Sequence, residues 1–287
     1  MKEYLMLLLA DLLLAGDFAI NKVYQKKQGT SLKAGFRFNA LLGLFTAVVF
    51  WILNGFQIEF TLFSALMAAG SAILITSYNL LGFRVLRNSS MAMYTLFLMT
   101  GGMIVPYVWG LLFLEEPFSF LRTLGLLLIV LSIGITVQSG KELKKATLIM
   151  CVAVFFINGF TSVINKMHQI QTELPCVSVT GFVMLSGLFK FILSGVGYLT
   201  TKGAAEEKVD FKIVLPIVLG SATASGLSYM FQLIPAENLP ATVLYPFVTG
   251  GSLVLSSIAG IILFQEKVSK KLLISILLCF IGTFMFL

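Results

Sequence analysis

Histidine, cysteine and charge are scarce in this sequence, and each scarcity excludes a class of protein. Among 287 residues there are one His, three Cys and only 11% charged residues. Cys151, Cys176 and Cys279 stand apart, without the paired spacing of a zinc site or an obvious disulfide framework. No Walker A, GxGxxG or HExxH pattern occurs. We therefore expect no cofactor, no bound metal and no enzymatic activity.

Long hydrophobic runs take the place of these features. Hydrophobic residues make up 58% of the chain, and 26 of them are Phe. The runs are each roughly 18 to 25 residues long, enough to cross a ~30 Å hydrocarbon core as a helix. They are continuously apolar, whereas barrel strands would alternate. We predict an all-α integral membrane protein with ten transmembrane helices, at residues 4–21, 34–55, 61–82, 91–114, 120–138, 146–166, 176–199, 212–234, 241–264 and 269–287.

A polar hexapeptide occurs twice in this apolar chain. INKVYQ at residues 20–25 and INKMHQ at residues 164–169 lie 144 positions apart, each at the end of a predicted span. Further matches keep the same order at offsets of 150 or 151: GSA at 70–72 and 220–222, Tyr78 and Tyr229, Tyr94 and Tyr245, and LFLE at 112–115 with LFQE at 263–266. We interpret these matches as a duplicated unit of five spans, comprising residues 1–140 and 146–287.

A unit with an odd number of spans ends on the opposite face of the membrane from where it began. The second unit would therefore enter the membrane upside down, and the two units would be inverted repeats around a central cavity. Secondary transporters commonly use this arrangement, because the two halves can exchange conformations and open a central site to either side in turn. The repeat thus favours a transporter that works by alternating access.

The ends of both units resemble a known family. LFLEEPFSFLRTLGLLLIVLSIGITV at residues 112–137 and ILFQEKVSKKLLISILLCFIGTF at residues 262–284 are similar to the two EamA-type repeats of the drug/metabolite transporter superfamily. The resemblance implies ten spans in two halves, with Glu115 and Glu266 ending the fourth span of each half and Lys22 and Lys166 as candidates for a Lys that ends the first. It also implies a secondary transporter of small organic metabolites or drugs, with efflux as the favoured direction.

Ionisable residues inside the apolar runs cost free energy, so each is a candidate for function. Asp11 and Asp17 lie six residues apart in the first run, about 240° around a helix, so both cannot face one cavity squarely. Asp17 fits either a salt bridge at the helix end or a coupling site for a proton or another ion. Asp11 would suit a proton relay if it faces the bundle. Lys190, near the middle of the seventh run, is either a snorkelling side chain or an anion site.

Aromatic and amide residues at matching positions of the two halves are candidates for a substrate cavity. A phenol combines an apolar ring with one hydroxyl, which suits a site that must hold and release a small organic molecule. The alternative is packing, or an aromatic belt at the membrane interface. The predicted cavity residues are Tyr78, Asn79, Tyr94, Tyr229, Gln232 and Tyr245.

For three further residues the expectations are simpler. His168 follows the sixth predicted span directly, and we expect its side chain to be exposed to solvent. Glu115 and Glu266 each end an apolar run beside other charged residues, so we expect them to cap the turn into the next span and not to contact substrate.

The cations are distributed unevenly between the two predicted faces. Fifteen Lys and Arg lie in or beside the connections that follow spans one, three, five, seven and nine, whereas Lys2, Arg122 and Lys166 lie on the other face. The positive-inside rule then places both termini outside the cell, while the family resemblance implies that they are cytoplasmic. A net charge of +7 indicates attraction to an anionic leaflet of a plasma or inner membrane and needs no nucleic acid.

Three classes of function fit a chain of this kind. A transporter of small organic molecules is favoured, with the lipid bilayer, the substrate and protons or another ion as its partners. A membrane enzyme acting on lipid would need an intramembrane His, Asp or Ser/Lys cluster, and the single His lies outside the apolar runs. A membrane scaffold or regulatory subunit would keep its function when the repeated polar and aromatic residues are replaced.

Overall fold

The computed structural model describes residues 1–28, 31–88, 91–136, 145–201, 211–265 and 270–287. These residues form ten helices: α1 (Lys2–Gln28), α2 (Leu32–Leu53), α3 (Leu62–Asn88), α4 (Met91–Phe113), α5 (Phe120–Thr136), α6 (Lys145–Gln169), α7 (Val179–Thr200), α8 (Phe211–Ala236), α9 (Ala241–Phe264) and α10 (Lys270–Phe284). Each of the ten predicted apolar runs coincides with one helix.

Several helices run past the ends of the apolar runs. α1 continues to Gln28 and α3 to Asn88, whereas the runs end at residues 21 and 82. Cations near the C-terminus of a helix interact favourably with its dipole, so Lys27 and Arg84 suit these extensions. The predicted ends at 21 and 82 therefore fall short of the helix ends, although the apolar part of α3, Leu62–Gly82, ends at the predicted residue. Hydropathy marks the hydrocarbon-compatible part of a helix and not its end. The predicted last residue of the fifth span, 138, lies outside the described residues.

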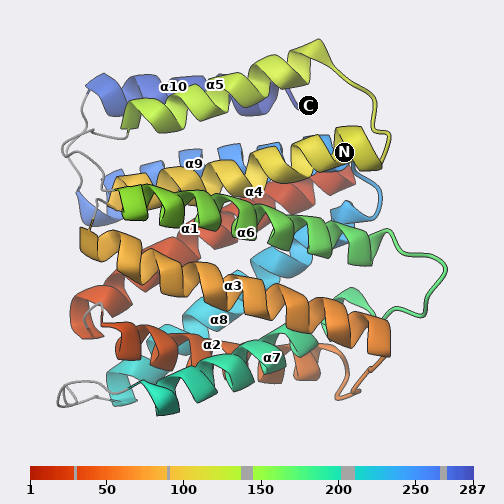
Figure 1. Ribbon diagram of the computed structural model, residues 1–287, viewed down its shortest axis with the longest axis vertical. Helices are drawn as coiled ribbons and strands as arrows, with labels where there is room; N and C mark the ends of the chain where they lie inside the picture. Colours follow the sequence, from red (N-terminus) through yellow and green to blue (C-terminus); the bar gives the residue numbers. More distant parts are fainter. Residues whose placement is uncertain (29–30, 89–90, 137–144, 202–210, 266–269) are drawn as a thin grey trace.

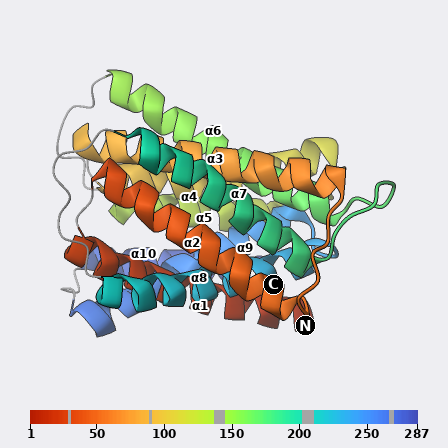
Figure 2. The same cartoon turned by 90° about the horizontal axis from the view of Figure 1, so that it is seen from below.

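The helices run along one common direction and form a two-layered bundle. α5 and α10 lie together at one end of the long axis, and α2 and α7 lie together at the other end (Figure 1). Between these pairs, α3, α4 and α6 form one layer and α1, α8 and α9 form the other (Figure 2). α6 packs against α3 and α4, while α1 packs against α8 and α9. Each layer thus combines two helices of one sequence half with one helix of the other half.

The outer helix pairs approach closely at small residues. In the α2–α7 pair, a Cβ atom on Gly43 would lie 2.7 Å from the Gly187 oxygen. In the α5–α10 pair, the Ser132 and Ser275 hydroxyls lie 3.0 Å apart, and each also donates to the backbone carbonyl of the other, at 2.8 and 2.9 Å. Small residues let helix backbones approach in this way inside a membrane.

The surface of the bundle is strongly apolar along the helices. Within the described residues, six helical segments are long and apolar enough to cross a membrane: Leu32–Leu53, Leu62–Gly82, Lys145–Gln169, Val179–Thr200, Phe211–Ala236 and Ala241–Leu263. Large side chains such as Leu131 and Leu199 are more than half exposed on the outside of the bundle. The chain is therefore an all-helical protein with the spans of a multi-pass membrane protein.

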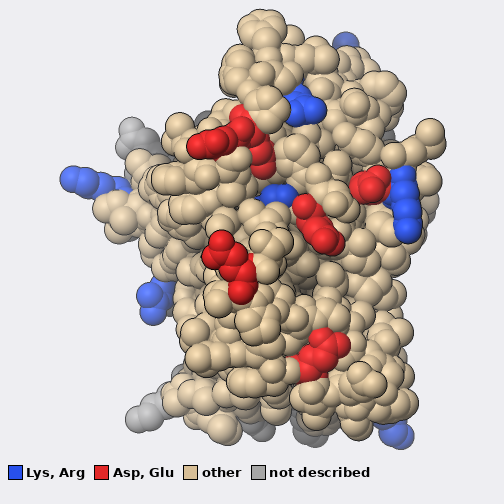
Figure 3. Space-filling view, turned by 90° about the vertical axis from the view of Figure 1, so that its right-hand side faces the viewer, with Lys and Arg blue, Asp and Glu red and all other residues tan. Residues whose placement is uncertain are grey.

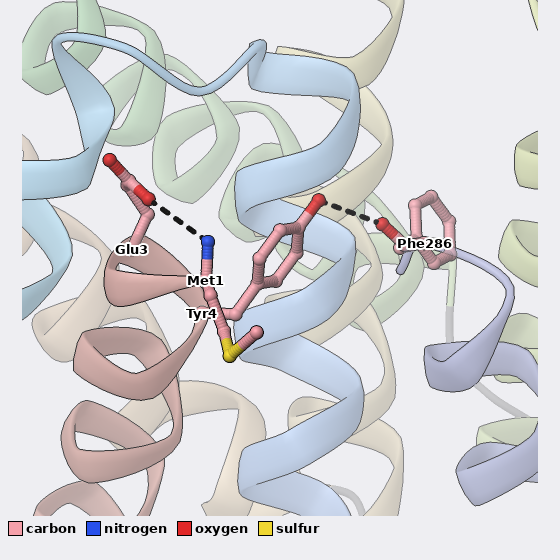
Figure 4. Close-up of polar contacts among 4 residues, drawn as sticks. All are labelled: Met1, Glu3, Tyr4 and Phe286. Carbon is pink, nitrogen blue, oxygen red and sulfur yellow. Dashed lines mark hydrogen bonds and ion pairs between the residues drawn. The ribbon is translucent and has the colours of Figure 1, made fainter.

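Both chain termini lie at the same end of the bundle, which we call the termini end. There the Tyr4 hydroxyl at the start of α1 donates to the Phe286 carbonyl (3.2 Å), and the Met1 ammonium lies 3.6 Å from Glu3 (Figure 4). Asp and Glu side chains gather on this end (Figure 3). We call the opposite end the basic end, because helices begin or finish there with Lys27, Arg84, Lys145, Lys212 and Lys270.

Candidate functional site

A buried amide joins three helices in the half of the bundle nearest the termini end. The Asn165 side-chain oxygen on α6 accepts hydrogen bonds from the Ser71 hydroxyl on α3 (3.1 Å) and from the Tyr229 hydroxyl on α8 (2.7 Å). Asn165 is the second residue of the INKMHQ stretch, and Ser71 belongs to the GSA repeat. We call Ser71, Asn165 and Tyr229 the Asn165 triad. The repeated sequence elements therefore meet in space.

The turn between α8 and α9 is held from both sides at the termini end. The Lys166 ammonium is buried and donates to the backbone oxygens of Ala236 (2.5 Å) and Leu239 (2.7 Å). The Glu116 carboxylate accepts from the backbone N–H groups of Ala241 (2.6 Å) and Thr242 (2.8 Å). A cation thus satisfies carbonyls at the end of α8, and an anion caps the start of α9. We call these contacts the α8–α9 clamp.

Tyr245 adds one more contact between α6 and α9 near the clamp. Its hydroxyl donates to the backbone oxygen of Ser162 (2.5 Å). Together with the Asn165 triad and the clamp, this bond ties α6 to α3, α8 and α9. The termini end of the bundle is therefore closed by hydrogen bonds between segments from both sequence halves.

His168 also lies in this closed region, so the expectation that it is exposed is wrong. Its side chain is 2% exposed and stacks on Phe182, with the ring centroids 3.9 Å apart. Its Nε2 atom lies 2.8 Å from the Ser64 hydroxyl. α6 continues to Gln169, which carries His168 into the interior between α3 and α7. The apolar run ends before this position, and for that reason hydropathy missed the burial.

A carboxylate in the α2–α3 connection fastens the start of α7. The Glu59 carboxylate accepts from the Ser178 N–H (2.5 Å), from the Ser178 hydroxyl (2.8 Å) and from the Asn54 amide (3.1 Å). Partial burial alone would raise the pKa of Glu59, but these hydrogen bonds outweigh burial and hold the pKa below its usual value of 4.5. The ionised carboxylate therefore stabilises the folded state.

The lowered pKa of Glu59 predicts a pH-dependent contribution to stability. This contribution is fully present above about pH 4.5 and is lost as the pH falls through the lower pKa of the folded state. We expect Glu59→Gln to lower the free energy of unfolding at neutral pH by about 1 kcal/mol or less, since the site is largely exposed. Thermal unfolding in detergent at neutral and acidic pH measures the effect, with Glu173→Gln in another connection at this end as control. An equal loss of unfolding free energy in both variants would contradict the stabilising role of Glu59.

The positions that match the closing contacts have other arrangements toward the basic end. Tyr78 matches Tyr229 and Tyr94 matches Tyr245, yet neither hydroxyl has a hydrogen-bond partner among the described residues. The Tyr94 ring lies against Gly82 of α3. Ser221, which matches Ser71, donates to the Asp17 carboxylate on α1, as does the Asn21 amide (3.0 Å). Among the described residues, the contacts of the Asn165 triad and of Tyr245 therefore have no equivalent toward the other end.

A hollow of about 480 Å³ opens between α2 and α3 toward the basic end. It is lined by Leu32, Phe36, Ser77, Leu80, Leu81 and Arg84. The predicted cavity residues do not line it, although Ser77 is the neighbour of Tyr78 along α3. The hollow lies at the end where the matched tyrosines lack hydrogen bonds to described residues.

The four predicted tyrosines form a series from Tyr94, near the start of α4, to Tyr245, near the start of α9. Tyr78 lies within electrostatic range of Tyr94 and of Tyr229, and Tyr229 lies within range of Tyr245. These side chains come from α3, α4, α8 and α9. Gln232 instead donates to the Ser228 hydroxyl of its own helix (3.1 Å), and Asn79 is half-buried on α3.

The charged residues predicted as coupling or charge sites do not form one cluster. Asp17 and Lys190 lie within electrostatic range of one another, on α1 and α7. Lys166 belongs to the α8–α9 clamp, whereas its match Lys22 lies in the last two turns of α1. Asp11 lies nearer the start of α1, beside Gly251 of α9. Among the described residues, no group of three His, Cys, Asp or Glu side chains could hold a metal ion.

Asp11 is fully buried, and neither carboxyl oxygen has a hydrogen-bond partner in the part of the chain described. An isolated buried carboxylate is costly, and Asn has the same shape without the charge. We therefore expect Asp11→Asn to keep the free energy of unfolding at neutral pH within about 1 kcal/mol of wild type, or to raise it. Thermal unfolding in detergent tests this expectation. A loss of more than about 2 kcal/mol would mean that the carboxyl has a stabilising partner.

Sequence reasoning missed two of the closing residues. Glu116 was not distinguished from its neighbour Glu115, which has a positive φ of 53° in the α4–α5 connection. Ser162 contributes a backbone oxygen, which leaves no signal in its side chain. An acidic residue in a connection is a general sign of a helix cap, but the sequence does not tell which helix it caps.

Comparison with known proteins identifies the fold and nothing more specific. No protein-family model matches the sequence. No curated protein matches it either. Among solved structures that do match, one crystal structure of a protein superposes with a TM-score of 0.79 at 14% identity, covering 99% of this chain and 96% of that chain. At this identity the similarity supports the helical architecture alone.

Proposed function

We propose that the chain is a secondary transporter of small organic molecules that works by alternating access. The observation that carries the proposal is a difference between matched contacts in the described part of the chain. Ser71, Tyr229 and Tyr245 form bonds that close the termini end, whereas their matches Ser221, Tyr78 and Tyr94 do not form the equivalent bonds toward the basic end. A protein with two equivalent gates, one closed and one open, has this pattern. The EamA-type family of the drug/metabolite transporter superfamily fits the same arrangement.

The packing of the helices supports two inverted five-helix repeats of ten transmembrane spans. If α1 matches α6, α3 matches α8 and α4 matches α9, then the α1–α8 contact corresponds to the α3–α6 contact, and the α1–α9 contact corresponds to the α4–α6 contact. Contacts between single residues correspond in the same way. A Cβ atom on Gly70 would lie 3.7 Å from the Ile164 Cδ1 atom, and one on Gly220 would lie 3.7 Å from the Ile20 Cδ1 atom. These pairs support a pseudo-two-fold relation between the two proposed halves, residues 1–140 and 146–287.

The tyrosine series is our proposed substrate site. Tyr229 and Tyr245 also help to close the termini end, whereas Tyr78 and Tyr94 lie toward the end with the hollow, so the series spans the region where a substrate would sit in an alternating-access cycle. Aromatic walls with a few hydroxyls suit a small, largely apolar organic molecule. With the basic end facing the cytoplasm by the positive-inside rule, the conformation described would be open inward in a plasma or inner membrane, and efflux would begin from it.

Counterflow in proteoliposomes tests the transport function. Vesicles containing purified protein are loaded in turn with amino acids, nucleosides, sugars or cationic dyes, and uptake of the same labelled compound is followed. We expect saturable counterflow of at least one class, and its loss on replacing Tyr94 and Tyr245 together by Ala. Counterflow unaffected by this double replacement would contradict the tyrosine site.

A scaffold or regulatory subunit is the second candidate. The strongly apolar outer surface favours this candidate, because a partner protein could bind to it. The two candidates differ in what they require of the interior. A scaffold needs only the fold, so folded variants with altered tyrosines would retain its partner, whereas a transporter would lose activity.

A further inference from the structure

The two matched gates differ in sequence at a polar position one turn before the matched Asn165 and Asn21. Residue 161 on α6 is Thr, whereas its match 144 positions earlier on α1 is Asp17. The Thr161 hydroxyl donates to the Ile157 oxygen of its own helix (2.9 Å), so it does not compete for Ser71, which donates to Asn165. Asp17 instead accepts the hydrogen bond of Ser221, the match of Ser71. The donor that would close the basic end is thus held by a carboxylate.

A serine hydroxyl has a single proton to donate, so Ser221 can serve one acceptor at a time. By analogy with the Asn165 triad, its acceptor in a closed basic end would be the Asn21 side-chain oxygen, joined by the Tyr78 hydroxyl. Hydrogen bonds to an ionised carboxylate are roughly twice as strong as those between neutral groups. An ionised Asp17 therefore outcompetes Asn21 for Ser221, whereas a protonated Asp17 loses that advantage.

Resting on the proposed function, we infer that Asp17 is a proton-operated lock of the basic end. While Asp17 is ionised, it holds Ser221 and Asn21 and keeps the gate formed by Ser221, Asn21 and Tyr78 apart. When Asp17 takes up a proton, Ser221 turns to Asn21, and the basic end closes as the termini end opens. Proton uptake at one end is thereby coupled to the conformational exchange.

The charged surroundings of Asp17 are few and specific. Lys190 on α7 is the cation in electrostatic range of the carboxyl, and Lys22 lies five residues farther along α1. On α8 the facing group is Ser221, and the cation of that helix, Lys212, lies more than two turns away at its start. α9 contains no charged residue between Ala241 and Phe264. The proposed lock therefore involves one carboxyl group, Asp17, with Lys190 as the cation in its electrostatic range.

The distance between spin labels across the basic end, measured in the full-length protein in nanodiscs, tests the inference. Lys27 and Arg84, both exposed, are replaced by labelled Cys, and the exposed Cys176 is replaced by Ser. As the pH is lowered from about 8 to about 5, we expect the population with the longer distance to convert into the population with the shorter distance. For one linked proton, the ratio of the two populations changes by at most tenfold per pH unit. Asp17→Asn and Asp17→Thr should show the shorter distance at every pH, whereas Asp11→Asn should titrate like wild type.

Each outcome bears on a different claim. Unchanged titration in folded Asp17→Asn and Asp17→Thr would overturn the assignment of Asp17, and loss of titration in Asp11→Asn would transfer the role to Asp11. Counterflow together with a distance that ignores pH would refute the lock while leaving the transporter intact. If no counterflow is seen and the labels across the basic end show a single distance at every pH, the transporter proposal is refuted instead. As a converse variant, Thr161→Asp should lengthen the distance across the termini end by withdrawing Ser71 from Asn165.

Discussion

Counterflow should fall at least tenfold when Asn165 is replaced by Leu. The substitution keeps the size of the side chain but removes the common acceptor of the Ser71 and Tyr229 hydroxyls. Each buried hydroxyl left without a partner costs about 1–3 kcal/mol, so the conformation closed at the termini end loses roughly 2–6 kcal/mol. Since 1.4 kcal/mol is a factor of about ten in an equilibrium constant, the population shifts toward a closed basic end and the cycle stalls. The measurement is counterflow of the substrate identified with the wild-type protein.

Asn21→Leu is the matched control for this experiment. Asn21 occupies the equivalent position on α1, so its replacement should impede closure of the basic end and hold the protein in the conformation described here. Both variants should transport poorly, but with opposite ends closed, which labels across each end distinguish. Wild-type counterflow in folded Asn165→Leu would show that the triad only packs the bundle.

The second large effect is on folding, at the α2–α7 crossing. A Cβ atom on Gly187 would lie 2.8 Å from the Ala47 nitrogen and 2.9 Å from the Gly43 oxygen. Both are backbone atoms, so no side chain can move aside. We expect Gly187→Val to lower the free energy of unfolding by about 3 kcal/mol or more and to reduce the yield of monodisperse protein.

Gly195, two turns farther along α7, provides the control for Gly187. A Cβ atom there would meet no other atom within 4 Å, apart from its own helix and neighbours. Gly195→Val should therefore unfold close to the wild-type temperature in the same detergent. A wild-type melting temperature for Gly187→Val would mean that α2 and α7 do not approach as closely as described.

Much of the architecture follows from the sequence because lipid permits few solutions. Continuous apolar runs in a membrane must be helices, and each predicted run does coincide with one. Helix ends were less predictable, as α3 shows by continuing to Asn88, because hydropathy does not record where backbone hydrogen bonding stops. Asn165 and Ser71 both belong to repeated stretches of the sequence and meet in space, but neither was among the predicted cavity residues.

The contacts of individual polar groups could not be derived in the same way. Lys166 reads as a cation near a helix end, and only the fold places the Ala236 and Leu239 carbonyls within its reach. Glu116 and His168 acquire their partners from segments more than 100 residues away in sequence. Such contacts depend on which helices become neighbours, which local periodicity does not encode.

The most direct test of the central claim follows two distances in one protein. One label pair replaces Glu173 and Glu237 at the termini end, and the other replaces Lys27 and Arg84 at the basic end; all four residues are exposed. Alternating access predicts two populations at each end that change in opposite senses, so that substrate or pH lengthens one distance as it shortens the other. A single, unchanging distance at both ends, in protein that is folded and supplied with substrate, would contradict the account.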